Sequence, residues 1–199
     1  LGSCPLHVDD GKIRAEPWVA QELFKRFRED KEIELSTVEE QKRGQSVEFC
    51  GVRYTEKDDG EILDQDIYVR NKLSLLDLNL VRGKQLDDEL SKEAAAIYGT
   101  TIGRLIWILP TQLRWSYEIS YLSRYRAYPR VKHFRRLAQV VTQIKNDPQH
   151  IFLPRFHPGN PIKVVAIVDA GQGEEADPPL KTRDHQCVLI ALTSPETPN

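Results

Sequence analysis

The spacing of apolar residues in the first part of the chain predicts one helix and several short strands. Val19, Leu23 and Phe27 recur every four residues, so they share one face of a helix that begins near Pro17. Short strands are expected at residues 5–8 and 12–14, around a first Asp-Asp-Gly triplet, and at about residues 33–35.

Alternating apolar and polar residues predict a β-hairpin around a second Asp-Asp-Gly triplet, residues 58–60. Its strands are expected at residues 47–54 and 61–66. Asp-Gly is a common turn pair between antiparallel strands. Both triplets are therefore expected to be turns, and only their surroundings can show whether either also holds a metal ion.

The middle of the chain has mostly helical periodicity. A helix is expected at residues 67–76, followed by a charged linker at residues 77–92. Residues 92–146 are expected to be helical in three pieces, broken at Pro110 and at Pro129. Irregular chain is then expected at residues 147–161, and strands at residues 163–170 and 186–192.

Composition places the chain among globular proteins, because 40% of its 199 residues are apolar and 29% are charged. No apolar run approaches the roughly 18 residues of a membrane-spanning helix, so no membrane partner is expected. The start has neither a secretory signal nor a methionine, which suggests a segment of a longer protein. The three cysteines lie far apart without zinc-binding spacing, as is usual in a reducing compartment such as the cytoplasm or nucleus.

Charge is segregated along the chain, although the formal net charge is only −2. Residues 1–98 carry a net charge of −7, residues 99–163 one of +9 and residues 164–199 one of −4. This asymmetry is typical of a segment that faces a polyanion. It also fits a solvated basic helix face that balances an acidic neighbour.

Residues 114–136 concentrate basic and aromatic side chains, with seven bases against one acid, Glu118. Arginine can neutralise phosphates and tyrosine can stack on bases, so one interpretation is nucleic-acid binding. The other is that the tyrosines pack in the core and the arginines face water. The tyrosines are Tyr117, Tyr121, Tyr125 and Tyr128, and the candidate nucleic-acid-binding cations are Arg124, Arg126, Arg130, Lys132, Arg135 and Arg136.

The order of several longer segments carries more information than any one of them. The first half of the chain contains LHVDDGKI, VEFCGVRYT and LDQDIYVRNKL. The second half contains IYGTTIGRLIWI, TQLRWSYEISYLSRY, YPRVKHFRRLAQVVTQIK and KVVAIVDAG. In this order the segments resemble the reverse transcriptase of copia-type LTR retrotransposons, from its late palm to the start of its RNase H domain.

The resemblance implies an α+β fold in which partial palm hairpins are followed by a helical thumb and connection and by the first strands of an RNase H-like domain. The implied activity is RNA-directed DNA polymerase with linked RNase H. The implied partners are an RNA/DNA template-primer and the remainder of a polyprotein. The implied regions are the end of the palm (residues 1–66), a thumb-like helix and linker (67–91), a basic helical connection (92–161) and a truncated RNase H-like start (162–199).

The resemblance also implies that Asp9 and Asp10 are catalytic carboxylates that bind Mg²⁺ in the polymerase site, and that Asp169 is the first Mg²⁺-binding catalytic carboxylate of the RNase H domain. Nucleotidyl transfer uses two such ions about 3.5–4 Å apart, held by hard oxygen ligands. From the residues alone, Asp9-Asp10 can equally be a plain turn, and Asp169 can simply end an apolar strand. Asp58-Asp59 lacks an apolar run on its N-terminal side and is interpreted as a solvated turn.

The chain also departs from the family. His7 replaces the usual tyrosine, TQLR at residues 111–114 replaces a threonine-arginine-proline-aspartate run, and Val168 replaces a common serine. Another palm aspartate would precede Leu1 and further RNase H acids would follow Asn199, so the isolated chain is expected to be inactive. The second hypothesis is therefore a non-catalytic or domesticated nucleic-acid-binding remnant.

Overall fold

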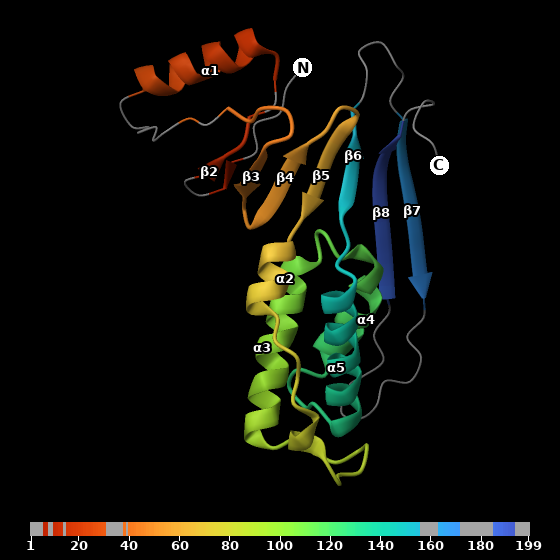
Figure 1. Cartoon of the computed structure of the whole chain (residues 1–199). Helices are drawn as coiled ribbons and strands as arrows, with labels where there is room; N and C mark the ends of the chain where they lie inside the picture. The colour runs from red at the N-terminus through yellow and green to blue at the C-terminus, as the bar shows by residue number, and fades with distance from the viewer. Residues whose placement is uncertain are drawn as a thin grey trace. The chain divides into compact units, whose positions relative to one another are not determined.

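A computed structural model of the chain describes residues 6–7, 10–13, 15–30, 38, 40–155, 163–171 and 185–193. The chain divides into two compact units, Leu1–Leu153 and Pro154–Asn199. The helices in Figure 1 are α1 (Pro17–Glu29), α2 (Asp66–Lys72), α3 (Lys92–Ile108), α4 (Ser116–Arg124) and α5 (Val131–Asn146), with short 3₁₀ turns at Leu78–Val81 and Leu113–Trp115. The strands are β1 (Leu6–His7), β2 (Asp10–Gly11), β3 (Ser46–Phe49), β4 (Val52–Glu56), β5 (Gly60–Asp64), β6 (Ile151–Pro154), β7 (Lys163–Gly171) and β8 (His185–Thr193).

The mixture of helices with a small antiparallel sheet is compatible with the α+β class. The helix expected near Pro17 is α1, and the three helical pieces expected before Asn146 are α3, α4 and α5, so these predictions are confirmed. Helix α3 begins after Ser91, whose hydroxyl accepts a hydrogen bond from the Ala94 N–H (3.2 Å). The strand expected at residues 33–35 lies outside the described residues.

The four-stranded sheet, in the order β3-β4-β5-β6, contains a turn that the alternating pattern did not predict. The expectation of one strand at residues 47–54 is wrong, because Phe49 pairs with Val52 and the chain reverses between them. Cys50 and Gly51 form this reversal with φ of 52° and 71°, the signature of a type I′ turn. Cysteine is uncommon at the first of these positions, so the pair lacks the usual Asn-Gly or Asp-Gly signal of such a turn.

We expect Cys50→Asn to raise the free energy of unfolding by about 0.5–1 kcal/mol. Asparagine tolerates the left-handed φ of position 50 better than cysteine, and Asn-Gly is the preferred pair for this turn. Urea denaturation of the parent and variant proteins measures the change. A lower stability of the variant would contradict this explanation.

Two residues of the first Asp-Asp-Gly triplet, Asp10 and Gly11, lie in a strand of the hairpin. His7 pairs with Asp10, so Asp10 and Gly11 lie in β2, and the expectation of a turn followed by a strand at residues 12–14 is wrong in register. Lys12, immediately after β2, donates a hydrogen bond to Glu61 Oε1 (2.8 Å) at the start of the β5 strand. The first hairpin is therefore tied to the sheet next to the second triplet.

The second triplet is a solvated turn, as predicted. Asp58 and Asp59 lie between paired strands and are exposed, and Asp58 forms an ion pair with Arg43. Gly60 begins β5 beside β6, an edge strand in the stretch that was expected to be irregular. A Cβ atom at Gly60 would lie 2.2 Å from the Leu153 carbonyl oxygen, so this glycine permits close approach of the two strands.

The core of the first unit joins α2, α3, α4 and α5. The largest buried side chains include Tyr98 and Phe134. The stretch expected to be a linker also belongs to this core, because Val81 is buried and Leu80 and Leu90 pack against it. Its many charges signalled an exposed surface, but they did not reveal these apolar contacts.

Lys145 fixes α5 against α2. Its Nζ donates hydrogen bonds to the carbonyl oxygens of Val69 (3.3 Å), Arg70 (3.3 Å) and Leu73 (2.6 Å). These carbonyls lie at the C-terminal end of α2, where intrahelical donors are lacking and a cation is favourable.

The second unit contains the antiparallel pair β7 and β8, which confirms the two strands expected there. Their register runs from Lys163 opposite Thr193 to Gly171 opposite His185. Across both units, the described helices include none with the length and apolar character needed to cross a membrane.

Candidate nucleic-acid interface

The six candidate cations all lie between the end of α4 and the first turns of α5. Arg124 ends α4, Arg126 lies in the connection, and Arg130 is the N-cap residue of α5. The remaining three, Lys132, Arg135 and Arg136, lie within α5 (Figure 1). The hairpin of two helices therefore gathers cations that are spread over thirteen sequence positions.

The two faces of α5 differ sharply. The face that carries Phe134, Leu137 and Val141 is fully buried. Arg135 and Arg136 are exposed on the opposite side. Burial of the apolar stripe thus fixes the rotation of the helix and directs its arginines toward solvent.

A buried histidine closes the start of α5. The Arg130 N–H donates a hydrogen bond to His133 Nδ1 (3.1 Å), so the histidine does what a glutamate or glutamine does in a capping box. The His133 ring stacks on Tyr125 with centroids 3.8 Å apart. The connection that carries Arg126 is thereby anchored at both ends.

Arg136 is held within the protein rather than left free. Its Nε and Nη2 each donate to a carboxylate oxygen of Glu118 at 2.7 Å, and its guanidinium carbon lies 4.9 Å from the Tyr121 ring centroid. The hydrogen bonds to Glu118 raise the pKa of Arg136. For this cation, the interpretation of a basic face balanced by an acid is correct.

Arg130 and Lys132 share an acidic partner. Asp87 Oδ1 lies 3.7 Å from Arg130 Nη1 and 3.1 Å from Lys132 Nζ. The backbone around Asp87 covers the start of α5, because the Val131 N–H donates to the Asp88 carbonyl (3.1 Å) and the Lys132 N–H to the Leu86 carbonyl (2.9 Å). An acidic loop therefore competes for two of the predicted cations.

We expect Asp87→Asn to raise the affinity of the chain for an RNA–DNA hybrid by about two- to five-fold at low salt, because Arg130 and Lys132 then lose a competing carboxylate. Fluorescence anisotropy with a labelled hybrid measures the change. The matched control is Asp58→Asn, which neutralises an exposed acid paired with Arg43 in the sheet. Equal effects of the two replacements would exclude a local competition.

Arg126 and Arg135 are exposed and form no ion pair within the described part of the chain. They are therefore the cations best placed to meet phosphates. Arg124 is half-buried at the end of α4.

The tyrosines divide between the two interpretations. Tyr125 is buried and Tyr121 is half-buried, as the core interpretation requires. Tyr117 and Tyr128 are exposed by 66% and 64%. Spacing alone could not separate them, because all four residues fit one helical repeat while α4 ends at Arg124.

The predicted catalytic aspartates are only partly described. Asp9 lies outside the described residues. Asp10 pairs with His7 in the first hairpin. Asp169, in β7, pairs with Cys187 in β8. The side chains of Asp10 and Asp169 are not among those described. Among the side chains that are, no three His, Cys, Asp or Glu residues form a group suited to a metal ion.

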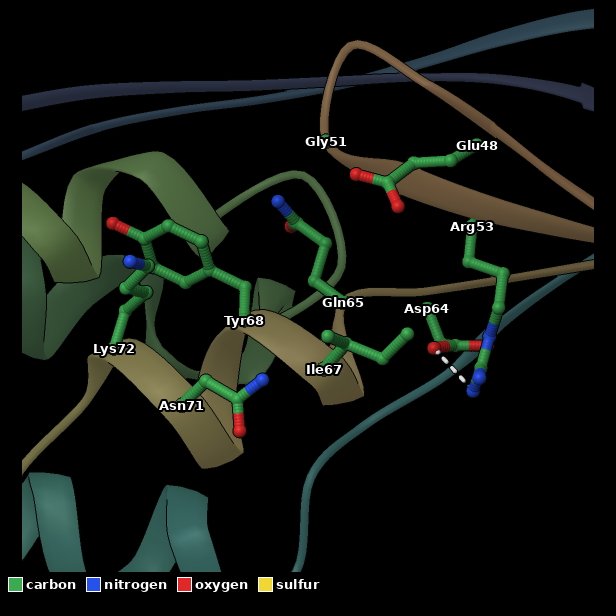
Figure 2. Close-up of a pocket in the computed structure, with 9 residues that line it drawn as sticks. All are labelled: Glu48, Gly51, Arg53, Asp64, Gln65, Ile67, Tyr68, Asn71 and Lys72. Carbon is green, nitrogen blue, oxygen red and sulfur yellow. Dashed lines mark hydrogen bonds and ion pairs between the residues drawn. The ribbon is translucent and has the colours of Figure 1, made fainter.

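A charged pocket of about 190 Å³ lies between the β3-β4 turn and α2. Figure 2 shows Glu48 and Arg53 on the strands, with Tyr68 and Lys72 on the helix. Arg53 pairs with Asp64 through two contacts of 2.9 and 2.8 Å, and this hydrogen bonding raises the pKa of Arg53. This group could not be predicted from the sequence, because it depends on the Cys50-Gly51 reversal that places β3 beside β4.

Asp66 extends this charged group on the other side. It lies 3.8 Å from Arg53 and 3.7 Å from Arg70, and His150 Nε2 lies 3.1 Å from both of its carboxylate oxygens. Since Asp64 and Asp66 are both buried and paired with basic groups, they hold β4, α2 and the chain before β6 together.

The first residues of the TQLR stretch, residues 111–114, also serve the fold. The Thr111 hydroxyl donates to Gln65 Oε1 (3.0 Å). The Gln112 side chain exchanges two hydrogen bonds with the backbone of Gln149, of 3.1 and 3.2 Å. Both Thr111 and Gln112 are buried, so these polar groups are placed to be satisfied inside the protein.

Comparison with known proteins found no matching family model, no similar curated protein and no similar solved structure.

Proposed function

We propose that this chain is the nucleic-acid-holding part of a copia-type retrotransposon reverse transcriptase, an RNA-directed DNA polymerase with linked RNase H. The observation that carries the proposal is the gathering of the six predicted cations around the α4-α5 connection. The ordered series of sequence motifs is the reason for proposing this family. The net charge of +9 in residues 99–163 would attract a polyanion such as a nucleic acid.

In this proposal, Arg126 and Arg135 contact the phosphates of the template-primer. Arg130 and Lys132 also contact phosphates when their ion pairs with Asp87 break. Arg136 mainly holds α4 and α5 together through its hydrogen bonds to Glu118. Contacts of this kind position a nucleic acid without reading its sequence.

Asp9, Asp10 and Asp169 are the residues that would hold Mg²⁺. Their carboxylate oxygens are the hard ligands that this ion prefers. At the polymerase site of Asp9 and Asp10, bound ions would activate the attacking 3′-oxygen and stabilise the leaving group, whereas Asp169 would hold Mg²⁺ in the separate RNase H domain. The buried Asp64 and Asp66 do not fit this role, because basic side chains already occupy their oxygens.

A primer-extension assay tests the catalytic part of the proposal. With a primed RNA template, Mg²⁺ and nucleotides, we expect this chain to bind the template-primer without extending it. Extension by the chain alone would contradict the expectation that a further palm aspartate is needed.

The alternative, a non-catalytic binding protein, shares the same cationic surface and differs in the neighbouring coding sequence. For a reverse transcriptase we expect a palm strand with an aspartate upstream and RNase H acids downstream. Coding sequence that lacks both would favour the non-catalytic alternative.

A further inference from the structure

Three tyrosines of α4 and its C-terminal end form a continuous series of ring contacts, named here the tyrosine stack. Tyr117 and Tyr121 have ring centroids 6.5 Å apart and planes inclined by 19°, whereas Tyr121 and Tyr125 have centroids 5.2 Å apart and planes tilted by 59°. Tyr125 continues to the buried ring of His133 at 3.8 Å. The inner end of the stack is therefore fixed by the core.

The outer end of the stack is open to solvent. Tyr117 is 66% exposed, although its ring lies against Tyr121. Tyr121 in turn is braced by the Arg136 guanidinium at 4.9 Å. The Tyr117 ring is thus held on one side by Tyr121, and a large part of its remaining surface faces water.

The two helices that carry this surface also carry cations that favour an anionic partner. Arg124 lies seven positions further along α4, on the same stripe as Tyr117 and Tyr121, and Arg135 is exposed on the neighbouring α5. The neighbouring acid Glu118 has both carboxylate oxygens bound by Arg136, so its repulsion of phosphates is largely cancelled.

We propose that Tyr117 is a stacking site for an unpaired nucleobase. The base of a single-stranded segment would stack on the exposed face of Tyr117, whose other side contacts Tyr121, while its phosphates approach the cations of α4 and α5. The proposal rests on the proposed nucleic-acid-binding function and sharpens it. The Tyr117 part of the surface would bind single-stranded nucleic acid, such as an unpaired template segment. The exposed arginines would instead contact the backbone of a duplex.

Binding of a short single-stranded oligonucleotide and of a blunt duplex to the full chain tests this site. Tyr117→Leu is expected to weaken single-strand binding by about five-fold or more and to change duplex binding less than two-fold. Tyr117→Phe keeps the ring and is expected to bind like the parent. A 2-aminopurine base in the single strand should be quenched by the parent and by Tyr117→Phe, and not by Tyr117→Leu.

Tyr128→Leu is the matched control. Tyr128 has nearly the same exposure and has no ring partner among the described residues. Equal losses for Tyr117→Leu and Tyr128→Leu, or unchanged single-strand binding by Tyr117→Leu, would overturn the inference. Those results would leave the proposed function standing if the parent binds duplex, whereas absence of binding to every nucleic acid would contradict both.

Discussion

Replacement of Gly60 by alanine is expected to lower the free energy of unfolding by about 3 kcal/mol. The new methyl group would lie 2.2 Å from the Leu153 carbonyl oxygen and 2.8 Å from the Phe152 ring. A backbone atom cannot rotate away as a side chain can, so β5 and β6 must separate. Urea denaturation monitored by circular dichroism measures the loss.

Gly103→Ala is the control, and it is expected to raise the free energy of unfolding instead of lowering it. Gly103 lies inside α3, where a Cβ atom would have no neighbour within 4 Å. Alanine is favoured over glycine in a helix by roughly 1 kcal/mol, so this variant should be more stable than the parent. If Gly60→Ala were as stable as the parent, the close approach of β5 and β6 would be wrong.

Reversal of two charges should have the largest effect on binding. We expect Arg126→Glu with Arg135→Glu to reduce affinity for an RNA–DNA hybrid by about ten-fold or more at low salt. The salt dependence should also weaken, by about 0.7–0.9 in the slope of log K against log salt for each lost phosphate contact. Fluorescence anisotropy titrations at several salt concentrations give both quantities.

Lys42→Glu with Lys57→Glu is the matched control, because it changes the net charge by the same amount at exposed positions in the sheet region. Its affinity should remain close to that of the parent. An equal loss in the two double variants would show that binding follows overall charge and not the α4-α5 surface.

Local patterns were sufficient wherever one element determines its own structure. The repeat of Val19, Leu23 and Phe27 predicted α1, and the breaks at Pro110 and Pro129 separated α3, α4 and α5, because proline removes a helical hydrogen bond regardless of context. The gathering of the six cations followed from these helices.

Features that depend on pairing between distant segments could not be predicted in this way. The strand β6 exists because it pairs with β5, and its own residues follow a proline and resemble loop. The Arg53 contacts with Asp64 and Asp66 depend on the Cys50-Gly51 turn, which lacks the usual asparagine. A register error of the same kind placed Asp10 and Gly11 in a turn, whereas they lie in the β2 strand.

The charge pattern predicted where the cations of α4 and α5 gather, but it did not predict the acidic residues that pair with them. The pairing of Asp87 with Lys132, and of Glu118 with Arg136, joins residues 45 and 18 positions apart. Such contacts reduce the number of cations available to a ligand, which composition alone overstates. We therefore expect fewer phosphate contacts than the net charge of +9 in residues 99–163 suggests.

The central claim is that the α4-α5 surface binds the backbone of a nucleic acid. The most direct test is the affinity of this chain for an RNA–DNA hybrid, measured as a function of salt concentration. We predict linear dependence of log K on log salt with a slope of about −2 to −4, as expected for roughly two to four phosphate contacts. Absence of binding at low salt, or binding whose affinity does not change with salt, would contradict the account.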